Sequence, residues 1–225
     1  MNELTLVRLS AGDVERILDL EHRVCIPPLQ VKRETLLHRF KVGNIMLGLQ
    51  KSPDDPTLVS TVAFRFSIFY PEHPEHFPSK FADFSTPPIV PPVCNAAFVY
   101  SFNVDPALRK GGYGFRICAH ILHPAFGIIE GTGCKYIIAD GRPTSYNGST
   151  GYPQEQCSVI PEFKAAIDAH LAGGPFPPEE TLFLEPTWRV YRHFVPSFKP
   201  LWILRDFFPQ DVPAGGLRVI LCAEI

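Results

Sequence analysis

The stretch Val104-Asp-Pro-Ala-Leu-Arg109-Lys-Gly-Gly-Tyr-Gly114-Phe-Arg-Ile117 joins two segments of different character and decides the fold. Before it, residues 95–104 form an apolar run that predicts a strand in the middle of a sheet. After it, residues 113–130 place apolar side chains at helical spacing, and residues 134–139 predict another strand. Because a strand, a helix and a strand in this order form a crossover unit, the two strands are predicted to run parallel.

Regular elements are also predicted on both sides of this unit. Ser10 and Asp13 have the spacing of a capping box, which marks the start of a helix. That helix continues with a helical period at Val14, Ile17, Leu18, Glu21 and Val24. Further helices are expected at 33–40, from Pro161 to the glycines at 173 and 174, and at 187–194, and further strands at 4–8, 44–49, 58–69, 198–205 and 217–223. This order predicts an α/β fold with a mixed sheet, in a single domain spanning residues 1–225.

Prolines interrupt the pattern in two places. The chain has 24 prolines in 225 residues, and residues 71–92 and 143–186 hold seven each. A composition of this kind does not sustain a central strand, so both segments are predicted as insertions into an ordinary α/β core. Within the helix at 113–130, Pro124 is expected to kink or split the helix, because it removes a backbone donor.

Composition excludes several classes of protein. The chain has 21 basic and 23 acidic residues, so its net charge of −2 gives no reason to expect nucleic acid or an anionic membrane as a partner. The first residues lack the features of a signal peptide, and no apolar run approaches a membrane span, so a cytoplasmic location is expected. Six scattered cysteines suggest neither a zinc site nor disulfides. No metal is predicted at the histidine pairs, because no nearby carboxylate or cysteine completes either set: His73 with His76, and His120 with His123.

The turn between residues 104 and 117 has the chemistry of a pyrophosphate cradle. It presents backbone N–H groups at a helix N-terminus, where the helix dipole adds positive potential. Its glycines allow close approach of a ligand, and Arg109 and Lys110 add charge. A dinucleotide fingerprint is excluded because Ile117 stands where its last glycine would be, and no P-loop sequence is present. A tight turn without a ligand remains the alternative.

The pattern Val104-x-Pro106-x-x-Arg109-x-x-Gly112-x-Gly114, in this order of elements, resembles the acyl-CoA signature of the GNAT superfamily of N-acetyltransferases. The resemblance covers residues 4–70, 94–142 and 186–224, and it implies a mixed sheet that is splayed at its centre. It implies that backbone amides at 109–114 hold the pyrophosphate of coenzyme A, and that the pantetheine arm pairs with the strand near 102–104. The cofactor-binding residues implied are Phe102, Asn103, Val104, Arg109, Lys110, Gly111, Gly112, Tyr113, Gly114 and Phe115.

The resemblance also implies direct attack of an amine on the thioester, so no cysteine nucleophile is required. Cys118 is accordingly predicted as a core residue. Many members of the family carry a glutamate on the strand before the motif, whereas residues 95–104 contain no acid. Asp140 is the preferred candidate to bind or deprotonate the acceptor, with capping of the turn before Gly141 as its structural alternative.

The leaving thiolate needs a proton. Tyr191 resembles the tyrosine that members of the family use, although the glycine of that pattern is missing and the spacing to Phe198 is longer. Packing is the structural alternative for Tyr191, and Tyr100 and Tyr146 are weaker candidates for the same role.

The sequence therefore predicts an N-acyltransferase that moves an acetyl or other acyl group from acyl-CoA to the amine of a small molecule or peptide, without a metal. The insertion at 143–186 begins at the carboxyl end of a central strand, so it is expected to form part of the acceptor pocket. Two other functions stay open: a catalytically silent domain that binds acyl-CoA as a sensor or interaction module, and a general nucleotide-phosphate binder. A homodimer is compatible with the sequence.

Overall fold

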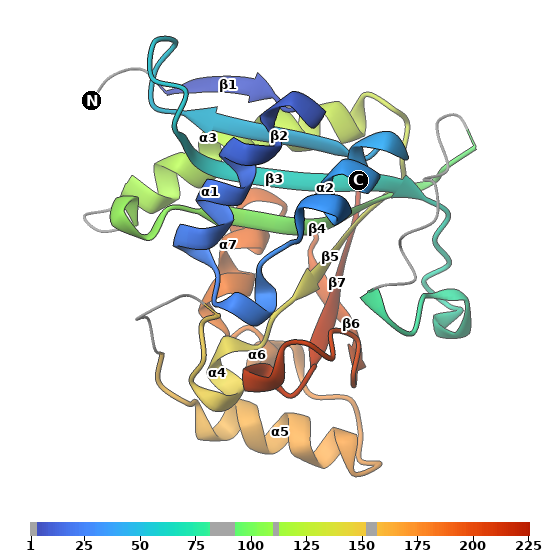
Figure 1. The fold of residues 1–225 in the computed structure, drawn as a ribbon. Helices are drawn as coiled ribbons and strands as arrows, with labels where there is room; N and C mark the ends of the chain where they lie inside the picture. Colours follow the sequence, from blue (N-terminus) through green and yellow to red (C-terminus); the bar gives the residue numbers. More distant parts are fainter. Residues whose placement is uncertain (1–3, 82–92, 110–112, 152–156) are drawn as a thin grey trace.

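Seven strands form one mixed sheet in the order β1-β2-β3-β4-β5-β7-β6 (Figure 1). The computed structural model describes residues 4–81, 93–109, 113–151 and 157–225. Neighbouring strands are antiparallel except β4 and β5, which are parallel as the crossover unit predicts. The strands are β1 (Thr5–Arg8), β2 (Ile45–Gln50), β3 (Leu58–Ser67), β4 (Ala96–Val104), β5 (Tyr136–Gly141), β6 (Lys199–Leu204) and β7 (Arg218–Glu224).

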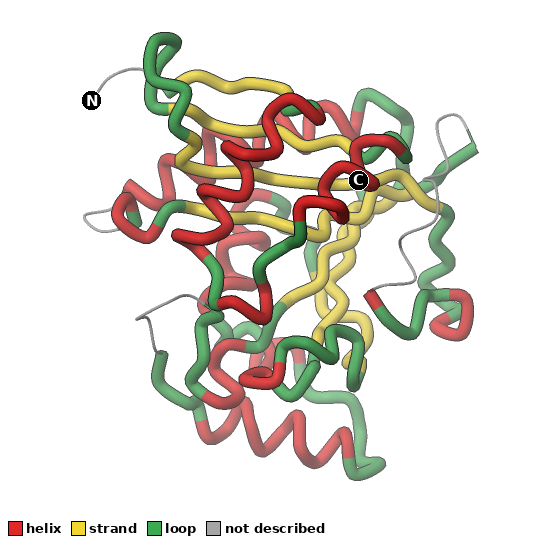
Figure 2. The backbone as a smooth tube through the Cα atoms, viewed as in Figure 1, coloured by secondary structure: helices red, strands yellow, loops and turns green. Residues whose placement is uncertain are grey.

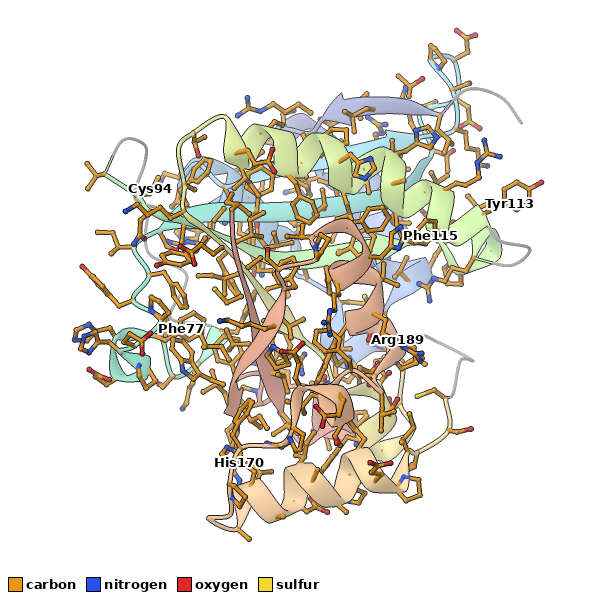
Figure 3. The ribbon with its side chains drawn as sticks, turned by 180° about the vertical axis from the view of Figure 1, so that it is seen from behind. Phe77, Cys94, Tyr113, Phe115, His170 and Arg189 are labelled. Carbon is orange, nitrogen blue, oxygen red and sulfur yellow. The ribbon has the colours of Figure 1, made fainter. Side chains whose placement is uncertain are left out.

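Helices cover both faces of the sheet. α1 (Val14–Val24) and α2 (Arg33–Lys41) lie on one face, and α3 (Tyr113–Glu130) and α7 (Pro186–Phe194) lie on the other (Figures 1 and 3). α4 (Thr144–Asn147), α5 (Pro161–Leu171) and α6 (Glu179–Leu182) lie near the ends of β5 to β7. Short 3-10 helices are η1 (Ala11–Asp13), η2 (Pro27–Leu29), η3 (Pro74–His76), η5 (Pro106–Leu108) and η7 (Val212–Ala214). No helix in the described ranges is long and apolar enough to span a membrane.

Two apolar clusters, one on each side of the sheet, stabilise this arrangement. The first joins β4 and β5 to α1 and α2, and includes Leu20, Phe98 and Ile138. The second joins the opposite faces of the same strands to α3 and α7, and includes Ile121 and Trp188. Side chains on a strand alternate between its faces, so neighbouring residues of β4 and β5 enter different clusters. The mixed α/β prediction is confirmed.

Local signals act as the sequence predicts, with one exception. Ser10 and Asp13 form the capping box: Ser10 N donates to Asp13 Oδ2 at 2.9 Å, and Gly12 N donates to Ser10 Oγ at 3.3 Å. α3, however, continues through Pro124 as one helix of 18 residues. Of the two expected effects of Pro124, the split is thus absent, because packing of Ile121, Leu122 and Ala125 in the core outweighs the lost hydrogen bond, and the kink stays a prediction.

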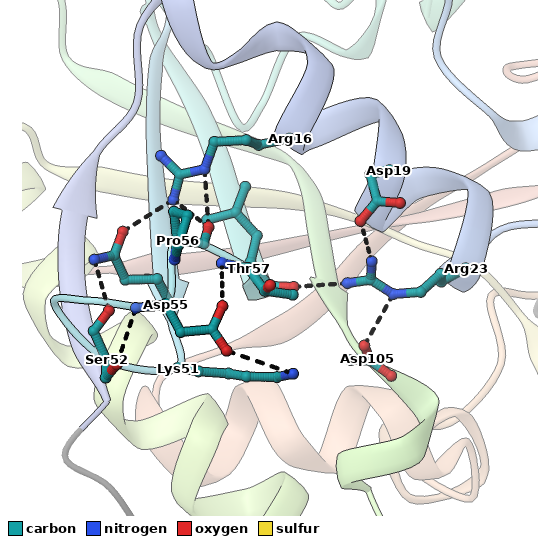
Figure 4. Close-up of polar contacts among 11 residues, drawn as sticks. Arg16, Asp19, Arg23, Lys51, Ser52, Asp55, Pro56, Thr57 and Asp105 are labelled. Carbon is teal, nitrogen blue, oxygen red and sulfur yellow. Dashed lines mark hydrogen bonds and ion pairs between the residues drawn. The ribbon is translucent and has the colours of Figure 1, made fainter.

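A polar network fixes α1 against the strands that lead to the glycine-rich turn (Figure 4). Arg23 of α1 pairs with Asp19 and donates from Nε to Asp105 Oδ2 at 3.1 Å. It also donates to Leu58 O at 2.7 Å. On the same helix, Arg16 donates from Nε to Pro56 O at 2.9 Å, in the loop between β2 and β3. The end of β4 is thus held in place from α1.

β4 and β5 part halfway along their length, as the tube in Figure 2 shows. Their parallel pairing begins at Ala96 with Tyr136 and ends at Val99 with Ala139. Beyond that point, in the ranges that the structure describes, β4 pairs only with β3, and β5 pairs only with β7. The central splay implied by the family resemblance is therefore present.

A β-bulge lies at the place where the strands part. In the pairing of β3 with β4, Ala63 faces Ser101 but Phe64 faces Val99, so Tyr100 is the extra residue. A bulge shifts the alternation of side chains by one position. Tyr100 and Asn103 consequently both point toward α1 and α2, whereas regular alternation would place them on opposite faces.

The two proline-rich segments pack against the core where they are described. In the first, Phe77 and Phe81 contact the ring of Phe207 with centroids 6.0 and 6.2 Å apart; residues 82–92 lie outside the described part. In the second, the expected helix is present as α5, and the short helices α4 and α6 were not predicted. Phe163 of α5 packs against Trp188 of α7 with ring centroids 5.5 Å apart.

Candidate functional site

The splay between β4 and β5 opens into a cavity of about 1090 Å³. Its wall includes residues from both sides of the sheet, such as Arg39 and Tyr100 on the α1 and α2 side, and Cys118 and Tyr191 on the α3 and α7 side. The cavity therefore passes through the sheet where the two strands part. A volume of this order is suited to a cofactor with an extended arm and a second substrate.

The described residues on both sides of the glycine-rich turn line this cavity, among them Val104, Arg109 and Gly114. Arg109 folds back over the end of β4, and donates from Nε and Nη2 to Val104 O at 3.0 and 2.5 Å. A Cβ added at Gly114 would meet Arg109 Cα at 3.2 Å, so the start of α3 approaches the turn too closely for a larger residue. Gly114 therefore permits close packing against Arg109, and a larger residue would displace the backbone there by a few tenths of an ångström.

The predicted cofactor residues divide into three groups. Phe102, Asn103, Val104, Arg109, Gly114 and Phe115 line the cavity. Tyr113 is half exposed and is not part of the wall, and Figure 3 shows it at the start of α3. Lys110, Gly111 and Gly112 lie outside the described residues. Contact with a cofactor stays a prediction for all ten.

A buried carboxylic acid approaches β4 from α1, and the sequence prediction of the site missed it. Asn103 Nδ2 donates to Glu21 Oε1 at 2.7 Å, and Asn103 Oδ1 accepts from Cys25 Sγ at 3.9 Å. Burial raises the pKa of Glu21 despite Arg39 nearby and the hydrogen bonds. One feature of the sequence could have revealed Glu21. It occupies a position of the helical period that otherwise holds buried apolar residues, such as Ile17 and Val24.

Asp140 lies at the carboxyl end of β5 and forms part of the cavity wall. Its Oδ2 is 3.6 Å from Nε of Arg218 on β7. Burial raises the pKa of Asp140 to about 7, although Arg218 and Arg39 favour its ionised form. An ion pair with Arg218 differs from capping of the turn before Gly141, which was the structural alternative for Asp140.

Asp140 belongs to a larger charged network behind the cavity wall. Asp211 is fully buried and accepts from Arg142 Nε at 2.7 Å and Nη2 at 2.9 Å. It also accepts from Arg218 Nη1 at 2.8 Å. Burial alone would raise the pKa of Asp211, but the two arginines lower it overall. Arg218 thus contacts both Asp211 and Asp140. Its contact with Asp211 fixes the guanidinium of Arg218 next to Asp140, the candidate base.

The tyrosine candidates have different surroundings. Tyr191 lines the cavity from the α7 side, with its ring centroid 6.3 Å from that of Phe102 and 6.0 Å from that of Phe198. Tyr100 is buried in the opposite wall, and its hydroxyl accepts from Asn44 Nδ2 at 3.2 Å. Tyr146 donates to Asp168 and lies outside the cavity wall. Asp140 and Tyr191 therefore face the cavity from opposite sides of the sheet.

The cysteines at the cavity have the properties of core residues. Cys118 is buried, as predicted, and burial raises its pKa to about 11. Burial also raises the pKa of Cys25, with Glu21 adding to the shift. Both thiols are thus protonated at neutral pH and are poor nucleophiles.

One sequence prediction about metals requires correction. His73 and His76 have a carboxylate beside them, because the side chain of Glu75 lies in the same cluster. His73 Nδ1 is 2.9 Å from Glu75 Oε1, and potential ligand atoms of all three residues lie within 4.8 Å of one another. The statement that nothing completes this pair is wrong. The three side chains are exposed on η3, away from the cavity wall.

Comparisons with known proteins place this geometry in a fold family. No protein-family model and no curated protein matches the sequence. Among solved structures, the loading GNATL domain of CurA from Lyngbya majuscula is 18% identical with a TM-score of 0.67, covering 99% of this chain and 98% of that one. The GphF GNAT-like decarboxylase in complex with isobutyryl-CoA is 18% identical with a TM-score of 0.63, covering 98% of both chains.

N-acetyltransferases of the same fold are also similar. NAA60 from Arabidopsis thaliana, in complex with a bisubstrate analogue, is 13% identical with a TM-score of 0.56, covering 99% of each chain. The similarity to all three spans nearly the whole chain, including the splayed pair of strands. The similarity to these structures shows that this chain has the GNAT fold.

Proposed function

We propose that the protein binds an acyl-CoA thioester in the splay between β4 and β5 and transfers its acyl group to an amine. The observation that supports this most strongly is the cavity that passes through the sheet, with residues on both sides of the glycine-rich turn, and Asp140, in its wall. Within the described part of the chain, residues 100–103 of β4 have no partner strand on the β5 side, so backbone groups on that edge are open to an extended pantetheine arm.

The two sides of the cavity would serve the two halves of the reaction. The amine enters from the side of α1 and α2, where Asp140 accepts its proton, and its nitrogen attacks the thioester carbonyl carbon. The C–S bond then breaks, and the thiolate takes a proton on the α7 side, where Tyr191 is the candidate donor. A carboxyl with a pKa of about 7 suits proton transfer near neutral pH.

The test is release of free thiol from acetyl-CoA across a panel of alkyl and aryl amines, with Asp140→Asn and Tyr191→Phe as variants. Amine-dependent thiol release that falls at least about 100-fold in Asp140→Asn supports both the activity and the base. Acetyl-CoA binding by calorimetry without turnover for any amine or thioester would instead indicate a sensor.

A second candidate is decarboxylation of a carboxyacyl thioester, which one observation favours. The cavity wall carries four arginines besides Arg109, and β4 carries no acid for amine activation; these arginines are Arg39, Arg65, Arg142 and Arg218. GphF, a decarboxylase by its description, has a higher TM-score with this chain than NAA60. In this reaction the bond to the carboxylate breaks, carbon dioxide leaves, and the resulting enolate takes a proton to give a shorter acyl thioester.

The two reactions have different products, so one assay separates them. Malonyl-CoA is incubated with the protein, first without an amine and then with the amine panel, and the products are identified by mass spectrometry. Conversion to acetyl-CoA without an amine identifies a decarboxylase, whereas free CoA and an acylated amine identify a transferase.

A further inference from the structure

Arg39 of α2 lies in the cavity wall with its guanidinium against two aromatic rings. Its Cζ is 4.8 Å from the ring centroid of Tyr100 and 5.5 Å from that of Phe81. Cation–π contacts with two rings restrain the position of a guanidinium and use none of its N–H hydrogen-bond donors. Within the residues that the structure describes, the side chain is thus positioned by aromatic rings and not by a carboxylate.

The acids near Arg39 are engaged elsewhere. Glu21 accepts from Asn103 at 2.7 Å, and Asp140 pairs with Arg218 at 3.6 Å. The charge of Arg39 favours the ionised form of both acids, so Arg39 is near each of them without forming an ion pair with either. Within the described ranges, no carboxylate comes within ion-pair distance of its guanidinium. Its charge-assisted hydrogen bonds are therefore available to a ligand.

The charge of the surrounding wall also favours an anion. Besides Arg109, four arginines line the cavity, and they outnumber the acids near them by one even when every acid is ionised. The arginines are Arg39, Arg65, Arg142 and Arg218; the acids are Glu21 and Asp140 in the wall and Asp211 behind it. A raised pKa at Asp140 and Glu21 leaves more positive charge uncompensated near neutral pH. The glycine-rich turn, which would hold the phosphates of CoA, is a separate cluster built around Arg109.

A further polar atom lies beside Tyr100. Asn44 donates to the Tyr100 hydroxyl at 3.2 Å, and its buried Oδ1 accepts no hydrogen bond from the described part of the chain. Asn44 also lines the cavity. An acceptor in this position can take a hydrogen bond from an N–H group of a ligand. The end of the cavity around Arg39 therefore offers a cation and an amide.

We infer that Arg39, whose guanidinium lies over the rings of Tyr100 and Phe81, binds a carboxylate group of the reacting ligands. This rests on the proposed function and names its substrate class: the carboxylate belongs either to the acyl group, as in a dicarboxylic acid thioester, or to an acceptor such as an amino acid. In both cases the planar guanidinium holds the carboxylate with paired N–H donors at the inner end of the cavity, on the side of α1 and α2.

The experiment compares ligands that differ only in this carboxylate. Dissociation constants for acetyl-CoA and malonyl-CoA are measured by calorimetry, and KM is measured for an amino acid and its methyl ester as acceptors. Arg39→Gln is the test variant, and Arg39→Lys keeps the charge without the planar fork. Lys41→Gln is the matched control, because it removes a positive charge from an exposed position of the same helix outside the cavity wall.

We expect Arg39→Gln to weaken binding of the carboxylated member of one pair about 10- to 100-fold while its uncharged counterpart changes less than about twofold. Loss confined to malonyl-CoA assigns the carboxylate to the acyl group, and loss confined to the amino acid assigns it to the acceptor. Equal affinity of wild-type protein for both members of each pair would overturn the carboxylate site, whether or not a variant folds.

A different result of the same experiment tests the proposed function. If wild-type protein binds neither thioester, acyl-CoA chemistry is wrong. The carboxylate site is then judged by whether free malonate raises the melting temperature of wild-type and Lys41→Gln protein but not of Arg39→Gln protein. Absence of that difference would overturn it.

Discussion

Asn103 of β4 and Glu21 of α1 form a buried hydrogen bond, with Asn103 Nδ2 and Glu21 Oε1 2.7 Å apart. The bulge at Tyr100 makes this contact possible, because it turns Asn103 toward α1. The bond joins the first helix to the open edge of β4, which is the strand that borders the cavity. A polar pair here shapes the wall as well as stabilising the fold.

This pair gives a prediction about stability. Glu21→Ala removes the acceptor and leaves the Asn103 amide buried without it, so the free energy of unfolding is expected to fall by about 1–3 kcal/mol. Glu21→Gln keeps the shape and one acceptor oxygen, so it is expected to lose less than half of that amount. Urea unfolding of the two variants measures the difference. Equal losses would contradict this explanation, because the retained shape and acceptor oxygen of glutamine would then preserve nothing.

The close approach of Gly114 to Arg109 predicts a defect in the glycine-rich turn. Gly114→Ala places a Cβ 3.2 Å from the Arg109 backbone, which must shift and move the turn. We expect affinity for acetyl-CoA to fall at least about 10-fold. Gly127→Ala is the matched control, because it lies on the same helix with nothing within 4 Å of the added Cβ. Calorimetry should show unchanged affinity for this control, and an equal loss in both variants would contradict the role of the turn.

The ion pair between Arg23 of α1 and Asp105 predicts that a change in α1 affects binding of acetyl-CoA at the turn. Arg23 holds Asp105 at 3.1 Å, and Asp105 caps η5 by accepting from Ala107 N at 3.0 Å. Arg23→Met keeps the packing of the stem but releases Asp105, so a weaker affinity for acetyl-CoA is expected with a stability loss of about 1 kcal/mol. Arg33→Met is the control, because its ion pair with Glu15 lies on the exposed surface. Unchanged CoA affinity in Arg23→Met would show that the turn does not depend on this bridge.

The strands and the longer helices could be predicted because each carries a local signal, whereas the four-residue helices α4 and α6 are too short to show a period. Periodicity located the helix at 113–130 and the strand before it, and the capping box located the start of α1. The bulge at Tyr100 has no such signal, because residues 96–100 are apolar on both faces and hide the alternation. Without the bulge, the side chain of Asn103 would be assigned to the wrong face.

The candidate site was predictable only where it is contiguous in sequence. The turn around Arg109 and Gly114 is a local motif, and Asp140 follows directly from the end of its strand. Arg39 and Arg218 come from separate elements, and they meet the cavity only through the tertiary fold. The carboxylate beside His73 was missed although Glu75 lies two residues away, because the compact turn of η3 brings them together.

The buried acid Asp211 predicts a large loss of stability when its charge is removed. Asp211→Ala leaves Arg142 and Arg218 without their shared carboxylate, and breaking one side of such a network costs about 3–5 kcal/mol. Because its pKa is lowered, the stabilisation from Asp211 is present above its unfolded pKa and is lost as pH falls through its folded pKa. Thermal unfolding of the variant at pH 7 and pH 3 checks both statements. A loss that is equal at the two pH values would contradict the ionic role.

The raised pKa of Asp140 predicts opposite effects of pH on stability and activity. Folding holds a proton on this carboxyl up to about pH 7, so stability falls as pH rises from about 4 to about 7. Asp140→Asn removes this fall, and the variant should gain stability relative to wild type across that range in thermal unfolding. If Asp140 is the base, kcat/KM rises over the same range as the carboxyl ionises.

An aryl amine with a pKa below 5 separates these effects, because its own ionisation does not contribute above pH 6. With this acceptor, the rise of kcat/KM near pH 7 should be present in wild type and absent in Asp140→Asn. Arg218→Lys keeps the charge beside Asp140 but loses the fork that also binds Asp211, so it should shift the midpoint of the rise without removing it. A rise that persists unchanged in Asp140→Asn would show that another group accepts the proton.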